Sequence, residues 1–257
     1  MGSLQMPVGE LSAAVSKNTF DSPRLELDVL ENLGIFVVRS LIELPTCHAL
    51  LSTFHDETNM EVVAGHPTKV LAGNEGLDLV LSSSRVTECF ARFFGGNYRC
   101  AEPQIFRKNQ DWPDKVKLHN DLMYLSGSSE KFSVFVALTE CSAENGGLIL
   151  YPGTHHFGLL GDAGELDRSA LPDGLPAVCP TLSPGDCLFM HSAIWHESNP
   201  LQSGSERVYY EFKLVHADDP WGRDADDVPS HSYRLPNNVQ ELFVDSRLQR
   251  LKRVYEG

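Results

Sequence analysis

The texture of residues 98–217 most constrains how this chain can fold. Short apolar runs alternate there with Gly, Pro, Asn and Asp, and the stretches "AENGG" and "SPGD" have the composition of tight turns. The run "FSVFVAL" is apolar at nearly every position, which is typical of a strand covered on both faces. We therefore expect an all-β core with flanking helices, a double-stranded β-helix of the jelly-roll or cupin-like kind. The expected strands are 132–140, 147–153, 186–198 and 207–217.

Helical patterns lie mostly outside this β region. Leucines cover one side of the segment from Leu25 to Leu33, and the following Gly34 is a common helix terminator. The next residues, "IFVV" at 35–38, predict a short buried strand. Further helices are expected at 44–57, 86–96 and 239–257. We expect a flexible N-terminus over residues 1–20 and a single domain over residues 21–257.

Composition excludes several classes of partner. The formal net charge of −14 argues against nucleic acid and anionic membrane surfaces, since both require clustered Lys and Arg. No apolar run approaches the roughly 18 residues that span a bilayer. The six cysteines stand singly without a C-x-x-C, so we expect free thiols in a reducing compartment. With no signal-peptide pattern at the N-terminus, these features predict a cytoplasmic protein that acts on a small molecule.

The stretch "KLHNDLMY" holds the strongest candidate site. Residues two apart in a strand point to the same face, so His119 and Asp121 are expected to project together. An imidazole beside a carboxylate supplies two ligands of a 2-His-1-carboxylate metal site. The third ligand is expected to be a histidine from a distant strand, and His191 and His196 are the two candidates that follow.

Two other pairs of the same type are weaker candidates. His55 and Glu57 fall on a predicted helix, where residues two apart point about 200° from each other. His216 and Asp218 have only His231 downstream, in a polar stretch. Neither pair is therefore as good a candidate for a metal site as His119 and Asp121.

Arg207 helps to choose between the two histidines. It opens the strand 207–217 after the turn "SNPLQSGSE", and only His196 lies at a suitable distance before that turn. An arginine fork recognises a carboxylate in bidentate fashion, and Ser198 adds a hydroxyl two residues beyond His196. A metal with open positions beside such a clamp predicts a site for a 2-oxo acid cosubstrate.

With these residues in place, the chain resembles the phytanoyl-CoA dioxygenase family of Fe(II)/2-oxoglutarate-dependent oxygenases. The resemblance rests on "HNDLMY", "FVALTECSAENGGLILYPGTHHFG" and "LSPGDCLFMHSAIWHESNPLQSGSER", and it covers roughly residues 25–215. It departs from the family at Phe135, where the family usually has Trp, and in the loop "RKNQDWPDKVK".

The resemblance implies a role for each candidate residue. Fe(II) would be held by His119, Asp121 and His196, and the distal carboxylate of 2-oxoglutarate by Arg207 and Ser198. His191 would then not be a ligand. Gln104 and Lys108 are further candidates for the cosubstrate, and His155 and His156 would be structural or rim residues.

The implied reaction is oxidation, most simply hydroxylation, of a C–H bond of a small metabolite. It consumes O2 and 2-oxoglutarate and releases succinate and CO2, with ascorbate as the reductant in vitro. Residues expected to line the substrate are Met123, Tyr124, Phe157 and Trp195. Two alternatives stay open, because two imidazoles and a carboxylate also suit a zinc hydrolase or a non-catalytic metal-binding jelly roll.

Overall fold

The computed structural model describes residues 6–54, 61–63, 66–70, 76–125, 128–157, 168–202 and 204–219 of the chain. All of them belong to one compact unit, residues 1–222, and residues 223–257 form a second unit outside the described residues. The expected closing helix 239–257 falls in that second unit. The single domain running to residue 257 therefore stays a prediction.

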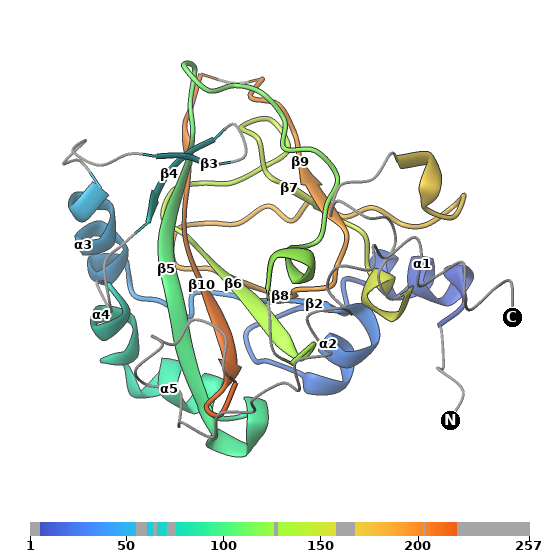
Figure 1. Cartoon of the computed structure of the whole chain (residues 1–257), viewed down its shortest axis with the longest axis horizontal. Coiled ribbons are helices and arrows are strands. Elements are labelled where there is room, and N and C mark those ends of the chain that lie inside the picture. The colour runs from blue at the N-terminus through green and yellow to red at the C-terminus, as the bar shows by residue number, and fades with distance from the viewer. Residues whose placement is uncertain are drawn as a thin grey trace, which may run out of the picture. The chain divides into compact units, whose positions relative to one another are not determined.

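An eight-stranded sheet forms the centre of the first unit, in the order β1-β2-β8-β6-β10-β5-β4-β3 (Figure 1). Its neighbouring strands are antiparallel, except for the parallel pair β1 and β2. The strands are β1 (Asp21–Ser22), β2 (Ile35–Val38), β3 (Glu61–Val63), β4 (His66–Val70), β5 (Tyr98–Lys108), β6 (Lys131–Ala137), β8 (Cys187–His191) and β10 (Arg207–His216).

A smaller sheet pairs β7 (Leu148–Leu150) with β9 (His196–Ser198). The expected strand 186–198 is thus two strands in different sheets, β8 and β9, because the chain turns between them. Leu150 and Trp195, from the smaller sheet and this turn, share one buried apolar cluster with Phe135 and Leu188 of the large sheet. One core cluster lies between the two sheets, and the expected double-stranded β-helix is confirmed.

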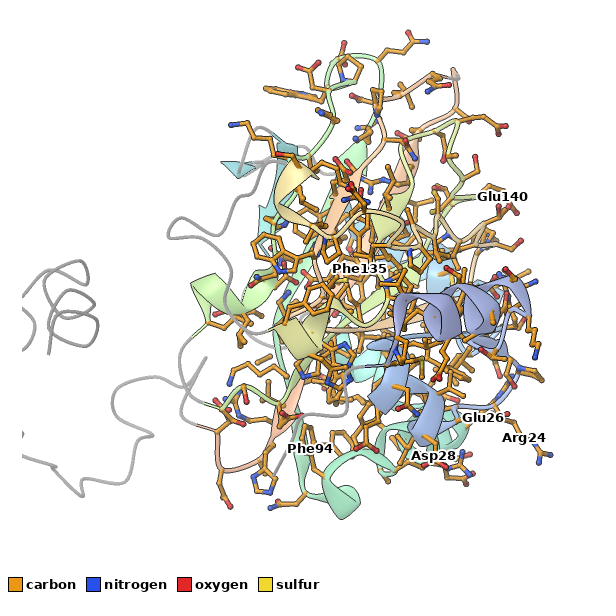
Figure 2. All side chains as sticks on the ribbon, turned by 90° about the vertical axis from the view of Figure 1, so that its right-hand side faces the viewer. Arg24, Glu26, Asp28, Phe94, Phe135 and Glu140 are labelled. Carbon is orange, nitrogen blue, oxygen red and sulfur yellow. The ribbon has the colours of Figure 1, made fainter. Side chains whose placement is uncertain are left out.

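The strand β6 is buried on both faces, as its unbroken apolar sequence predicts. Val134 and Val136 belong to the cluster between the large sheet and the helices, whereas Phe135 and Ala137 belong to the cluster between the two sheets. Figure 2 shows Phe135 within the interior. One strand therefore contributes to both cores.

Helices α3, α4 and α5 cover one face of the large sheet, beside β5 (Figure 1). The expected helix 86–96 ends at Phe90, because Phe94 and Gly95 have positive φ angles of 48° and 62°. No helix in the described ranges is long and apolar enough to cross a membrane. The helices are α1 (Val8–Ser16), α2 (Leu27–Leu33), α3 (Leu44–Phe54), α4 (Leu77–Leu81) and α5 (Ser84–Phe90), with 3-10 turns η1 (Phe93–Gly96), η2 (Asp121–Tyr124), η3 (Thr154–Phe157) and η4 (Arg168–Ala170).

The N-terminal segment is more ordered than its sequence predicts. Residues 8–16 form α1, and the side chains of Leu11 and Phe20 are buried in the cluster between the sheets. The structure therefore differs from the expected flexible N-terminus over residues 8–20. The reason is that these two apolar side chains are removed from water by packing against the core.

A bulge interrupts the pairing of β5 with β10. Glu211 faces Gln104, but Lys213 faces Ala101, so β5 has one residue more than β10 across this step. Glu102, inside the extra stretch, has a positive φ of 49°. Bulges re-aim side chains and are common beside active sites. This one lies at Glu211 and Lys213 of β10.

Gly34 supports the packing at the end of α2. Its φ is 71°, and its N–H donates to the carbonyl of Leu30 at 2.7 Å. A Cβ added at this position would lie 2.5 Å from His155 Nδ1 and from Ile194 Cδ1. We expect Gly34→Ala to lower the free energy of unfolding by roughly 2–4 kcal/mol, from the left-handed backbone and the overpacking together. Chemical denaturation measures this change. Gly9→Ala is the control, because Gly9 lies within α1 with nothing near its missing Cβ. Equal midpoints for the two variants would contradict the account.

Candidate metal centre

A single backbone bridge brings the two histidines of the site together. His119 and His196 form an antiparallel pair in which the N–H of each donates to the carbonyl of the other, at 2.9 and 2.8 Å. Directly opposed residues on neighbouring strands place their side chains on the same face. The imidazole ring centroids are accordingly only 4.3 Å apart. These two hydrogen bonds join residues that lie 77 positions apart in the sequence.

Asp121 joins them from a 3-10 turn and not from a strand. The extended segment ends before Asp121, which begins η2, and the N–H of Leu122 donates to the carbonyl of Ser192 at 2.9 Å. The expected strand through "KLHNDLMY" is therefore wrong in its second half. The expected convergence still occurs, because the turn directs Asp121 Oδ1 to 3.7 Å from His119 Nε2 and 3.6 Å from His196 Nε2.

The spacing and orientation of the donor atoms suit a metal ion. One ligand atom from each residue lies within 4.8 Å of the other two. The Nδ1 atoms of His119 and His196 lie 2.7 and 3.0 Å from the carbonyl oxygens of Lys117 and Ile194. Because a carbonyl only accepts, each Nδ1 carries the proton and each Nε2 presents a lone pair. Ring orientation by a bond to the far nitrogen is what metal-binding histidines generally show, so the residues fit a divalent metal such as Fe(II) or Zn(II).

The charge states also suit a metal. Burial lowers the pKa of His196 to about 4, with His119 adding to the effect, so this imidazole is neutral near pH 7. Burial alone would raise the pKa of Asp121, but Lys213 and the two histidines hold it well below its usual range. The site therefore presents a carboxylate together with a neutral imidazole at physiological pH, as metal binding requires.

The other histidine candidates lie elsewhere. His191 ends β8, and its Nε2 lies 3.6 Å from Glu130 Oε2 instead of facing Asp121. His216 and Asp218 are both exposed and 3.8 Å apart. Among the described residues, His119, Asp121 and His196 are the group that could hold a metal. His55, Glu57 and His231 lie outside the described residues.

Two buried cations lie near Ser198, which stands two residues beyond His196 in β9. Arg207 and Lys108 face each other on β10 and β5, and their exposed fractions are 4% and 0%. Lys108 Nζ donates to Ser198 Oγ at 2.8 Å and to the carbonyls of Asp114 and Asn199. The Arg207 guanidinium lies over the ring of Tyr209, 4.6 Å from its centroid.

These two cations have no carboxylate partner among the described residues. Within the described part of the chain, no carboxylate forms an ion pair with Arg207 or Lys108. Burial, with Arg207 adding to it, lowers the pKa of Lys108 to about 7. Ser198 Oγ accepts from Lys108 and from the N–H of Val116, which leaves its own hydrogen to donate. The two buried cations and this hydroxyl hydrogen are thus suited to a carboxylate supplied from outside the chain.

Gln104 contacts Glu211, and its expected role toward the cosubstrate stays a prediction. Its Nε2 donates to Glu211 Oε2, and Glu211 in turn pairs with Lys213, beside the metal centre. The sequence analysis missed Glu211 and Lys213, and it missed Ser133, whose hydroxyl donates to Asp121 Oδ2 at 2.6 Å. A signal was present, because two charged residues alternate with apolar ones in a strand expected to be buried.

The four residues expected to line the substrate have different positions. Trp195 is fully buried in the cluster between the sheets, and Phe157, in η3, packs against the same cluster while partly exposed. Met123 and Tyr124 lie in η2, directly after the metal-binding carboxylate, and their side chains lie outside the described part of the structure. Their role toward a substrate stays a prediction.

A double-stranded β-helix that brings two histidines and one carboxylate together, with a buried arginine nearby, has the features of an Fe(II)/2-oxoglutarate-dependent oxygenase. The family model of phytanoyl-CoA dioxygenase (PhyH) matches residues 36–209. The chain therefore belongs to the phytanoyl-CoA dioxygenase family, and it is an enzyme that uses iron and 2-oxoglutarate. No curated protein matches the sequence.

Several solved structures have a similar fold. The non-heme alpha ketoglutarate dependent epimerase SnoN from nogalamycin biosynthesis is 19% identical with a TM-score of 0.65, over 86% of this chain and 91% of that one. The carbocyclase SnoK, also from nogalamycin biosynthesis, is 18% identical with a TM-score of 0.62, over 78% and 87%. EctD from S. alaskensis is 16% identical with a TM-score of 0.64, over 77% and 78%. At these identities the likeness concerns the fold.

The geometry predicts which histidine binds the metal. We expect His196→Ala to abolish tight binding of Fe(II), because it removes an Nε2 that faces Asp121. His191→Ala should retain the metal, since this imidazole contacts Glu130 instead. Anaerobic titration with Fe(II), followed by measurement of metal per protein, compares the two variants. Equal loss of iron from both would show that the ligand set is wrong.

Proposed function

We propose that this protein oxidises, most simply hydroxylates, a C–H bond of a small-molecule metabolite, with His119, Asp121 and His196 as the metal ligands. The observation that carries the proposal is the buried cation pair beside this triad, which has no carboxylate partner in the described part of the chain. A zinc hydrolase or a simple metal-binding protein has no use for such a pair.

The spacing of the two parts of the site supports 2-oxoglutarate as the molecule between them. His196 and Ser198 stand two residues apart in β9, so the metal centre and the clamp are separated by about 7 Å. That separation is comparable to the length of a five-carbon dicarboxylate. Arg207 supplies a planar pair of donors for the distal carboxylate, and Ser198 supplies its free hydroxyl hydrogen.

The chain's own residues orient and enclose the reactants. When bound, iron with 2-oxoglutarate and O2 supplies the oxidising power, and succinate and CO2 are released. Arg207 and Ser198 fix the cosubstrate at its far end, so that its 2-oxo acid end is directed along β9 toward the triad. The apolar residues between the sheets exclude water from this space. The protein thus contributes position and exclusion, while the cofactor contributes the chemistry.

The substrate is proposed to be a modest-sized, largely apolar or amine-bearing metabolite. SnoN has been solved in complex with Fe3+, alpha ketoglutarate and nogalamycin RO, and SnoK is a carbocyclase of the same biosynthesis. These neighbours support a role in specialised-metabolite tailoring. The net charge of −14 disfavours a CoA thioester, whose phosphates need clustered cations.

The test of the proposal separates an oxygenase from its alternatives. Anaerobic addition of 2-oxoglutarate to the Fe(II) protein should produce a weak charge-transfer band in the visible. Aerobic incubation with a panel of metabolites and ascorbate should then release succinate with some of them. Zn(II) in place of Fe(II) is the control and should support neither signal. Turnover of an ester or amide with Zn(II), and no band with Fe(II), would reverse the conclusion.

Arg207 is predicted to control affinity for 2-oxoglutarate but not for iron. Loss of a buried, charge-assisted pair costs on the order of 2–5 kcal/mol, so Arg207→Leu should weaken 2-oxoglutarate binding about 30-fold or more. Arg207→Lys should recover little, because an ammonium lacks the planar fork. The intensity of the visible band during titration measures the affinity.

Arg107→Leu is the matched control for this experiment. Arg107 lies in β5 and pairs with Glu206 Oε2 at 2.6 Å, with both side chains partly exposed. It should leave the affinity for 2-oxoglutarate unchanged. An Arg207→Leu variant that binds the cosubstrate as tightly as the Arg107→Leu variant would place the clamp elsewhere.

Lys108 makes cosubstrate binding depend on pH. Its pKa of about 7 is lowered by burial and by Arg207, with Asp114 opposing them, and a bound carboxylate would raise it again. The ammonium is therefore present below pH 7 and is lost as the pH rises through about 7. We expect 2-oxoglutarate affinity to fall by up to about tenfold per pH unit above that value. Titrations at pH 6 to 9 measure the slope, and Lys108→Met should remove it. A slope retained in Lys108→Met would assign the titration to another group.

A further inference from the structure

A buried chain of charges stands behind the metal-binding carboxylate. Lys213 Nζ donates to Asp121 Oδ2 at 2.8 Å, to Ser133 Oγ at 2.8 Å and to Glu211 Oε1. An ammonium has three hydrogens, so all of its donors are used. The exposed fractions of Lys213 and Glu211 are only 6% and 1%, and Gln104 donates to the second oxygen of Glu211.

The two oxygens of Asp121 have different surroundings. Oδ2 accepts from both Ser133 and Lys213, at 2.6 and 2.8 Å. Oδ1 instead faces the Nε2 atoms of the two histidines. Binding a metal through both oxygens would require Oδ2 to give up two hydrogen bonds, one of them to a cation, inside the protein. Such charge-assisted bonds contribute about 1.5–3 kcal/mol each.

Glu211 explains why a lysine is tolerated here. An uncompensated ammonium near the ligand of a divalent cation would repel the metal, since charges interact strongly in a buried site. Glu211 restores a net negative charge to the group of Asp121, Lys213 and Glu211. Burial raises the pKa of Glu211, although Lys213 opposes this. The bulge in β5 lies beside these two residues.

We propose that Lys213, held in place by Glu211, is a positioning residue that keeps Asp121 bound to the metal through Oδ1 alone. One coordination position is thereby kept for the cosubstrate. The inference rests on the proposed function for the identity of that cosubstrate, but the geometry at the metal can be tested without it.

The test uses the full-length protein loaded with Co(II), whose visible absorption intensity reports coordination number. We expect Lys213→Met to lower this intensity, because the released Oδ2 binds the metal as a second oxygen. Glu211→Gln should leave the spectrum unchanged, because its amide oxygen still accepts from Lys213. It should weaken Co(II) binding by about ten- to hundredfold, since the compensating charge is lost.

Two further variants keep the result interpretable. Ser133→Ala removes one bond to Oδ2 without changing charge, and it should shift the spectrum in the same direction as Lys213→Met but less. Lys131→Met breaks a different buried ion pair, between Lys131 and Asp219, in the neighbouring strand β6. It should lower the melting temperature and leave the Co(II) spectrum unchanged.

The outcomes separate the two proposals. A Co(II) spectrum in folded Lys213→Met identical to that of the unmodified protein overturns the positioning role. The positioning role is also overturned if Lys131→Met changes the spectrum as much as Lys213→Met does. It is overturned too if Lys213→Met does not fold and Ser133→Ala leaves the spectrum unchanged. A protein that binds Co(II) but not 2-oxoglutarate would contradict the proposed function alone. With 2-oxoglutarate added, we expect Lys213→Met to bind it about tenfold or more weakly, because the second oxygen of Asp121 must first be displaced.

Discussion

Charge buried in a protein must be balanced, and this requirement organises the inner face of β10. Three charged residues, Arg207, Glu211 and Lys213, alternate there with apolar ones, all of them nearly inaccessible to water. Lys213 is balanced within the chain by Asp121 and Glu211. Arg207, together with Lys108 of β5, has no such partner in the described residues. The charges at one end of β10 are thus balanced within the chain, whereas the charge at the other end suits an anionic ligand.

Backbone pairing places the two candidate histidine ligands at the end of β10 where the charges are balanced within the chain. The bridge between His119 and His196 sets the separation of the imidazoles, and the bonds from each Nδ1 to a nearby carbonyl set their orientation. The 3-10 turn places Asp121, and its carboxylate depends in addition on side chains, because Ser133 and Lys213 hold one of its oxygens. The positions of the two histidines therefore follow from backbone pairing. The carboxylate also depends on hydrogen bonds from side chains that could be replaced without changing the fold.

The turn between β8 and β9 explains why one histidine of the run lies beside Asp121 and the other does not. His191 is the last residue of a strand in the large sheet, and His196 is the first residue of a strand in the small one. The chain crosses from one sheet to the other between them, so their side chains face different surroundings. Arg207 then follows on β10, after the chain returns to the large sheet.

The sequence by itself determined the class of fold, and it singled out three candidate metal ligands and Arg207, because these depend on local signals: apolar runs between turns, an H-x-D, and a spacing from His196 to Arg207. It also indicated that β6 is buried on both faces. Only the tertiary structure decided the helical turn at Asp121, the place of Gln104 beside Glu211, and the partnership of Lys213 with the carboxylate. Those contacts join strands far apart in sequence, and the bulge in β5 sets their register. A charged residue in a strand shows no local sign of the partner that neutralises it, because that partner is supplied by the pairing of distant segments.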